Sequence, residues 1–150
     1  MTTSPAGRKL IESFEGCVLT AYQDQRGIWT CGFGHTGADV REGTNCTQEQ
    51  ADVWLAQDLL TAETAIEHQL PPDLALTQNQ FDALVSFVYN IGSGNFLIST
   101  VRKKLQLSPP DYQAASAAMG MWCKTKGVVN PGLVRRRAAE MALFNTPDMI

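Results

Sequence analysis

The sequence contains no long hydrophobic run. No stretch comes near the roughly 18 uncharged apolar residues that a membrane span needs, and residues 1–8 hold no apolar core of the kind found in a secretory signal. The sequence therefore predicts no stable membrane insertion. If the protein acts outside the cytoplasm, we expect a factor that this chain does not carry to deliver it.

Patterns typical of metal ligands are also absent. The cysteines form no Cys-x-x-Cys pair, and the two histidines, His35 and His68, lie far apart in the sequence. Structural and catalytic zinc sites usually draw on closely spaced ligand pairs. We therefore expect no metal site, and zinc hydrolases fall low among the candidate functions.

A surplus of positive charge is missing as well. The chain has 12 Lys and Arg against 15 Asp and Glu, a formal net charge of −3. General nucleic-acid binders carry a basic surplus, so we expect no nucleic-acid partner. Eight of the 12 basic residues nevertheless fall between Arg102 and Arg137, where Asp111 is the only acid. This stretch fits either local binding of an anionic polymer or a solvated charged face.

The composition supports a folded core. Of 150 residues, 44% are hydrophobic and 18% charged, which suits one compact domain or two small lobes sharing a core. The N-terminal part predicts a short helix over residues 4–15, capped by Ser4 and stopped by Gly16. A β-hairpin follows, with strands at 18–22 and 28–31, and then a glycine-rich loop over 32–43.

Helical patterns dominate the rest of the chain. A capping box at Thr47 and Gln50 opens a long helix over 48–69, and a second at Thr77 and Gln80 opens an apolar, buried helix over 81–91. Three shorter helices are expected at 99–106, 110–123 and 133–144. The predicted class is α+β, with a small N-terminal hairpin lobe at about 15–50. The helix 48–69 joins it to a larger helical lobe, which comprises about 73–150 packed with the helix 4–15.

The four cysteines, Cys17, Cys31, Cys46 and Cys123, are an even number that hints at an oxidising compartment. If all four form disulfide bonds, three connectivities are possible. We favour Cys31 with Cys46, because the glycines between them make the segment pliable. Buried free thiols remain the alternative.

Two carboxyl groups near the N-terminus differ in their expected environments. Glu15 ends a helix, where the dipole and the apolar neighbours favour the protonated acid, whereas Asp24 lies in a polar turn and should be ionised and wet. Such a pair suits glycosidic bond cleavage, and the Thr30 hydroxyl could hold a water between them. On these residues alone, ordinary surface positions are the favoured interpretation of both carboxyls.

The spacing of these residues resembles a known catalytic motif. Glu15, Asp24 and Thr30, followed by Gly-x-Gly-His at 32–35, resemble the T4-like phage lysozymes, glycoside hydrolase family 24. The resemblance covers nearly the whole chain, including residues 79–84, 87–92, 96, 99–100, 132–137, 140 and 143–144. It implies the two-lobed lysozyme fold.

The function implied by this resemblance is that of an endolysin muramidase. Such an enzyme hydrolyses the β-1,4 bond between N-acetylmuramic acid and N-acetylglucosamine in bacterial peptidoglycan, without a cofactor and as a monomer, and so lyses the host cell. Glu15 would be the general acid, Asp24 the base or charge stabiliser and Thr30 the positioning hydroxyl. An inverting reaction implies carboxyls about 6.5 to 9.5 Å apart. A lytic transglycosylase, a non-catalytic peptidoglycan-binding module and a structural protein are the alternatives.

Supporting roles follow from the same resemblance. Asn90 and Gly34 are expected to bind substrate, and His35 and Arg136 to support the site structurally. Of the three arginines at 135–137, we expect one to be structural and the others solvated. Cys17 suggests a redox lock next to the acid. The enzyme would be made in the host cytoplasm and reach the periplasm or cell wall through a holin or a signal-anchor absent from this chain.

Overall fold

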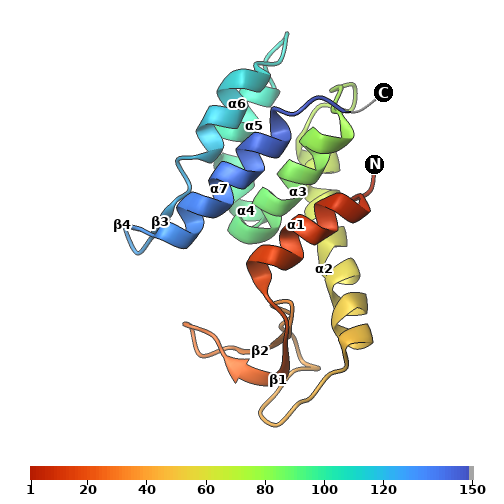
Figure 1. The fold of residues 1–150 in the computed structure, drawn as a ribbon. Coiled ribbons are helices and arrows are strands. Elements are labelled where there is room, and N and C mark those ends of the chain that lie inside the picture. Colours follow the sequence, from red (N-terminus) through yellow and green to blue (C-terminus); the bar gives the residue numbers. More distant parts are fainter. Residues whose placement is uncertain (149–150) are drawn as a thin grey trace. The chain divides into compact units, whose positions relative to one another are not determined.

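A computed structural model describes residues 1–148 (Figure 1). The helices are α1 (Pro5–Glu15), α2 (Gln48–Gln69), α3 (Gln78–Ile91), α4 (Ser93–Ile98), α5 (Thr100–Leu105), α6 (Tyr112–Met119) and α7 (Pro131–Phe144). The strands are β1 (Val18–Gln23), β2 (Trp29–Gly32), β3 (Lys124–Thr125) and β4 (Val128–Val129), paired antiparallel as β1–β2 and β3–β4.

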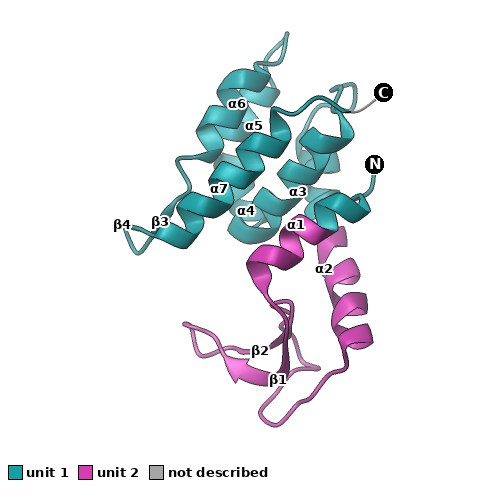
Figure 2. Ribbon diagram, viewed as in Figure 1, with its two compact units in different colours: residues 1–8, 61–150 teal, residues 9–60 magenta. Residues whose placement is uncertain are grey.

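The chain divides into two compact units (Figure 2). Unit 1 comprises Met1–Arg8 and Thr61–Ile150, and unit 2 comprises Lys9–Leu60. The division falls inside α1 and α2, so each of these helices contributes residues to both units.

Unit 2 is built on the β1–β2 hairpin. Tyr22 pairs with Thr30 across the two strands, and a bulge interrupts the pairing between Val18 and Tyr22. A small core forms where Cys31 and Trp54 pack with their apolar neighbours. Gly32 has a φ of +68°, and a Cβ there would lie 3.1 Å from the Ala51 Cβ of α2. Glycine at this position therefore allows both the turn of the strand and the close approach of the helix.

Unit 1 is organised around α3. Its residues from Phe81 to Val88 are all buried, and the helix packs against α4 and α7. The polar members of this run are satisfied within the unit: Asp82 accepts hydrogen bonds from the backbone and hydroxyl of Ser4. The predicted central buried helix is confirmed.

Most predicted elements agree with the structure. Helix α2 has the predicted bounds, 48–69. The Thr47 hydroxyl caps it by accepting a hydrogen bond from the Gln50 backbone amide. Helix α3 begins three residues earlier than predicted, because its capping box at Thr77 is complete. The predicted helix 110–123 already ends at Met119 in α6.

Two elements were missed. Gly92, with a φ of +90°, ends α3 but is followed at once by α4, so the glycine-rich segment is a corner between helices rather than a loop. The β3–β4 hairpin turns at Lys126 and Gly127, which have φ values of +52° and +79°. Both positive angles suit a tight two-residue turn, which the sequence analysis did not identify.

Candidate active site

Glu15 is the last residue of α1. The helix ends there because Gly16 takes a φ of +64°, while its amide still donates to the Glu12 carbonyl at 3.0 Å. Glu15 is half-buried. The predicted position at a helix C-terminus is confirmed.

Asp24 opens the turn between β1 and β2. Its Oδ1 accepts hydrogen bonds from the backbone amides of Arg26 at 2.8 Å and Ile28 at 3.0 Å, and its Oδ2 lies 3.2 Å from the Arg26 guanidinium. These contacts, the Ile28 amide foremost, lower the pKa of Asp24 below its ordinary value. The side chain is 24% exposed. The ionised state and the wet environment of Asp24 stay predictions, and the polar turn supports them.

Thr30 lies on β2 and is 4% exposed. Its hydroxyl donates to the Ile28 carbonyl at 2.9 Å. This contact fixes the direction of the hydroxyl hydrogen and turns the oxygen into an acceptor for other groups. One turn of chain, Asp24 to Ile28, thus orients both the carboxylate and the threonine.

Tyr22 is a residue that the sequence analysis missed. Burial raises the pKa of its phenol, and the negative charges of Glu15 and then Asp24 raise it further. Both predicted carboxyl groups therefore raise the pKa of the same phenol in unit 2. In the sequence Tyr22 looks like an ordinary aromatic strand residue, and its position opposite Thr30 in the hairpin register is the signal that could have identified it.

Gly34 and His35 lie in the loop that follows β2. Mutual backbone hydrogen bonds of 2.9 Å join Cys31 to His35, so Gly34 turns inside a tight loop with a φ of +83°. The His35 ring stacks on Trp54 with centroids 4.4 Å apart, and its Nδ1 lies 2.8 Å from an Asp58 oxygen of α2. These contacts attach the loop to the helix.

The same histidine has a second acidic neighbour. His35 Nε2 lies 3.0 Å from Asp39, so carboxylates face both ring nitrogens. A ring held in this way suits a supporting role better than proton transfer to substrate. Such a supporting role for His35, and a binding role for Gly34, stay predictions.

A buried ion cluster occupies the interface of α3 and α7. Glu140 has no exposed surface, and it accepts hydrogen bonds from the Ser86 hydroxyl and from Arg136 Nε, the latter at 3.3 Å. Its Oε1 lies 2.7 Å from Arg137 Nε in an ion pair. Burial raises the pKa of Glu140, and the two guanidiniums oppose this shift.

The arginine triplet therefore differs from the prediction. Arg136 is 4% and Arg137 1% exposed, and only Arg135 of the three is exposed. The expectation of one structural and two solvated arginines was wrong, because a buried glutamate can balance two guanidiniums where the sequence suggested one. Arg137 also donates to the Asn90 side-chain oxygen at 2.8 Å, which orients the amide at the end of α3.

The cysteines are free thiols in this structure. The favoured pair, Cys31 and Cys46, has its two sulfurs 3.2 Å apart, which is a contact distance and longer than the ~2.05 Å of a disulfide bond. The prediction that Cys31 and Cys46 are neighbours is confirmed, but no disulfide bond joins them in this structure. Burial, followed by the neighbouring Cys31 thiol, raises the pKa of Cys46 to about 11.

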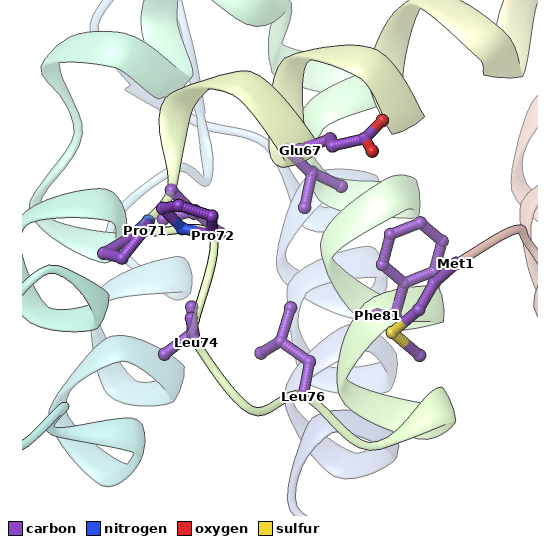
Figure 3. A pocket seen from close by; sticks show the side chains of 9 residues that line it. Met1, Glu67, Pro71, Pro72, Leu74, Leu76 and Phe81 are labelled. Carbon is purple, nitrogen blue, oxygen red and sulfur yellow. The ribbon is translucent and has the colours of Figure 1, made fainter.

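A pocket of about 190 Å³ lies elsewhere, within unit 1 (Figure 3). Most of the residues that line it have apolar side chains, with Pro71, Leu74 and Leu76 on the segment between α2 and α3, and Phe81 on α3. Glu67 is the one carboxylate among its lining side chains. The pocket thus lacks the pair of acidic groups that glycosidic cleavage needs. Within residues 1–148, no three His, Cys, Asp or Glu side chains gather in a way that could hold a metal ion.

Comparison with known proteins leads to the same family as the motif of Glu15, Asp24 and Thr30. The family model described as phage lysozyme matches residues 12–140. The chain belongs to the phage lysozyme family. Its predicted α+β lysozyme fold and its predicted lysozyme-type glycoside hydrolase class are confirmed by this membership and by the relatives below.

Three relatives illustrate the similarity. An endolysin of Acyrthosiphon pisum secondary endosymbiont phage 1 is 43% identical over 97% of this chain and 99% of its own length. The muramidase domain of SpmX from Asticaccaulis excentricus superposes with a TM-score of 0.88 at 42% identity, over 97% of this chain and 99% of the domain. A mutant of P22 lysozyme superposes with a TM-score of 0.86 at 39% identity, with the same coverage of 97% and 99%.

These names place the chain among the phage endolysins with muramidase-type relatives. None of the three is named as a transglycosylase, a non-catalytic binding module or a structural protein, so these alternative functions gain no support. None of the helices within residues 1–148 combines the length and the apolar character that a bilayer-spanning segment needs.

Proposed function

We propose that this endolysin hydrolyses the β-1,4 bond between N-acetylmuramic acid and N-acetylglucosamine in bacterial peptidoglycan, and so lyses the host cell. The proposal rests on one observation above others: two backbone amides and the Arg26 guanidinium hold the Asp24 carboxylate in the hairpin turn, while Glu15 ends the helix α1 directly before the same hairpin. The motif spacing and the family membership support opposite tasks for the two carboxyls in one reaction.

In the proposed reaction, Glu15 donates its proton to the glycosidic oxygen as the bond from that oxygen to the sugar C1 breaks. Asp24 accepts a proton from the water that attacks C1 on the opposite face of the ring, and the Thr30 oxygen accepts a hydrogen bond from the same water. Positive charge develops at C1 in the transition state, and the ionised Asp24 stabilises it. The products are two sugars with free hydroxyl groups, and no cofactor takes part.

The stereochemical outcome is part of the proposal. A water between acid and base leads to inversion at C1, and requires a carboxyl separation of about 6.5 to 9.5 Å. NMR of the first product formed tests this directly. Inversion gives the α-anomer, whereas an initial β-anomer would point to a covalent intermediate on Asp24.

Other residues have supporting parts in this proposal. Asn90 and Gly34 bind the glycan, while His35 and Arg136 hold the elements that carry the site. The protein acts as a monomer that forms a single lysozyme domain, with lobe boundaries near residues 15–50 and 73–150 and a connecting helix at 48–69.

The central test uses two isosteric variants. Glu15→Gln and Asp24→Asn should each lower the rate of turbidity loss of chloroform-permeabilised Gram-negative cells by about 10² to 10⁴-fold. Glu12→Gln, one turn earlier on α1, is the matched control and should keep near wild-type activity. Unchanged lysis by a correctly folded Glu15→Gln protein would remove the hydrolase proposal.

Mass spectrometry of the released muropeptides separates the hydrolase from its alternatives. Hydrolysis adds one water and leaves a reducing N-acetylmuramic acid, whereas a transglycosylase leaves an anhydro-sugar. A non-catalytic binding module would sediment with sacculi and release neither product.

Phage endolysins act on the host cell wall, and the route there belongs to the proposal: synthesis in the host cytoplasm, then release through a holin or a signal-anchor. In an oxidising periplasm, Cys31 and Cys46 form a disulfide, which their 3.2 Å sulfur separation supports. Non-reducing mass spectrometry should show the loss of two hydrogens after oxidation, and Cys46→Ser should abolish this loss. Lysis assays with and without reductant test the proposed Cys17 lock.

A further inference from the structure

The β3–β4 hairpin, residues 124–129, exposes an unusual combination of side chains. Val128 is 69% and Val129 54% exposed, and Lys124 and Lys126 are exposed beside them. We call this segment the basic hairpin. The catalytic proposal uses none of its residues.

The basic hairpin is firmly held at its base. The Asn130 amide donates to the Cys123 carbonyl at 2.8 Å, and its side chain donates to the Thr125 hydroxyl at 3.2 Å. The Trp122 ring packs edge-on against Phe87 of the buried helix α3, with centroids 6.4 Å apart. Isolated two-stranded hairpins are marginally stable in water, and these contacts supply the missing support. The exposed valines are therefore presented on a fixed element.

The apolar side chains lie on both faces of the hairpin. In its register Lys124 pairs with Val129 and Thr125 with Val128, so each face carries one valine. A protein partner docked on one face would leave the other valine in water. If the hairpin inserts edge-first into an apolar layer, both valines are covered. A hydrated glycan offers no apolar layer of this kind. This arrangement favours a lipid surface over a folded partner or a polysaccharide.

The charge of the surrounding chain favours an anionic surface. No acidic residue occurs from Tyr112 to Ala139. The helix α7 begins next to the basic hairpin (Figure 1), and Arg135 in its first turns is exposed. Unit 1 carries nine Lys and Arg against seven Asp and Glu, whereas unit 2 carries three against eight. The positive charge is thus concentrated on the unit that bears the hairpin.

We propose that the basic hairpin binds the surface of anionic phospholipid membranes. Lys124, Lys126 and Arg135 pair with lipid phosphates, and Val128 and Val129 enter the headgroup boundary, as in interfacial binding by amphipathic elements. This function is independent of the proposed hydrolysis. Its consequence is retention of the enzyme at the membrane that lies next to its polymer substrate.

The test is sedimentation of the full chain with vesicles of phosphatidylglycerol and phosphatidylcholine in equal parts, and with vesicles of phosphatidylcholine alone. We expect binding to the anionic vesicles that weakens as salt is raised. Because each basic residue near such a surface contributes about five-fold in affinity, a Lys124→Glu, Lys126→Glu double variant should lose at least about 25-fold. A Val128→Ser, Val129→Ser double variant should also bind more weakly.

The matched control is Lys103→Glu with Lys104→Glu, which makes the same charge change on α5 and should bind like the wild type. Muramidase activity on soluble peptidoglycan fragments confirms that each variant is folded. Equal wild-type binding to both kinds of vesicle, or equal losses in the hairpin and α5 variants, would overturn the proposal. So would binding to purified sacculi that depends on the hairpin lysines while vesicle binding does not.

Discussion

The ion cluster between α3 and α7 allows a quantitative prediction, in which Arg137→Met is compared with Arg135→Met. Arg137 is 1% exposed, pairs with Glu140 at 2.7 Å and lies 5.1 Å from the centroid of the Phe87 ring. Methionine fills much of the same volume, so the loss is mainly that of the charge. Arg135, two residues earlier on the same helix, is exposed and serves as the matched control.

Removing one partner of a buried ion pair costs about 3 to 5 kcal/mol, because the remaining charge stays desolvated. At roughly 2 to 4 °C per kcal/mol for a protein of this size, Tm should fall by about 6 to 20 °C. Arg135→Met should change the free energy of unfolding by no more than about 0.5 kcal/mol. Thermal unfolding followed by circular dichroism measures both changes.

The stability that Arg137→Met loses relative to the wild type should depend on pH. Burial raises the pKa of Glu140, and Arg137 is the largest opposing influence, so Arg137→Met raises that pKa further. A group with a raised native pKa destabilises the fold only where the unfolded chain would ionise it, above about pH 4.3. The difference between variant and wild type should therefore be largest near pH 7 and shrink below pH 4. Equal Tm values for the two methionine variants, or a stability loss that grows in acid, would contradict the proposed energetic role of the Arg137–Glu140 ion pair.

Three further predictions concern unit 2. Arg26→Ala removes a side chain that lowers the pKa of Asp24, so the acid limb of the kcat/KM profile should move to higher pH, and an unmoved limb would contradict the assigned role. Tyr22→Phe should lower kcat about ten-fold with little change in Tm, since it deletes the hydroxyl of a 40% exposed phenol whose pKa both carboxyls raise. Gly32→Ala should lose about 1 to 3 kcal/mol more stability than Gly43→Ala in denaturant titrations. Their φ values of +68° and +83° are alike, and only the Gly32 Cβ would meet α2.

Local features of the sequence determined the positions of most elements. The α2 helix has its capping threonine and its terminating prolines next to it in the chain, so its bounds followed from a few neighbouring residues. The polar turn around Asp24 was equally predictable, because its hydrogen-bond donors lie two and four residues away. The motif Glu15, Asp24, Thr30 then identified the family.

Tertiary structure decided the features that depend on distant partners. Arg136 and Arg137 are buried because Ser86 and Asn90, about 50 positions earlier, meet them on a neighbouring helix. No local pattern says which of three adjacent arginines turns inward.

The same holds for Tyr22, whose environment is set by Glu15 on the preceding helix as well as by Asp24 beside it. Capping, periodicity and turn chemistry act over a few residues and can be read along the chain. The choice of a buried ionic partner, or the set of charges around one phenol, is fixed only when packing brings separate segments together.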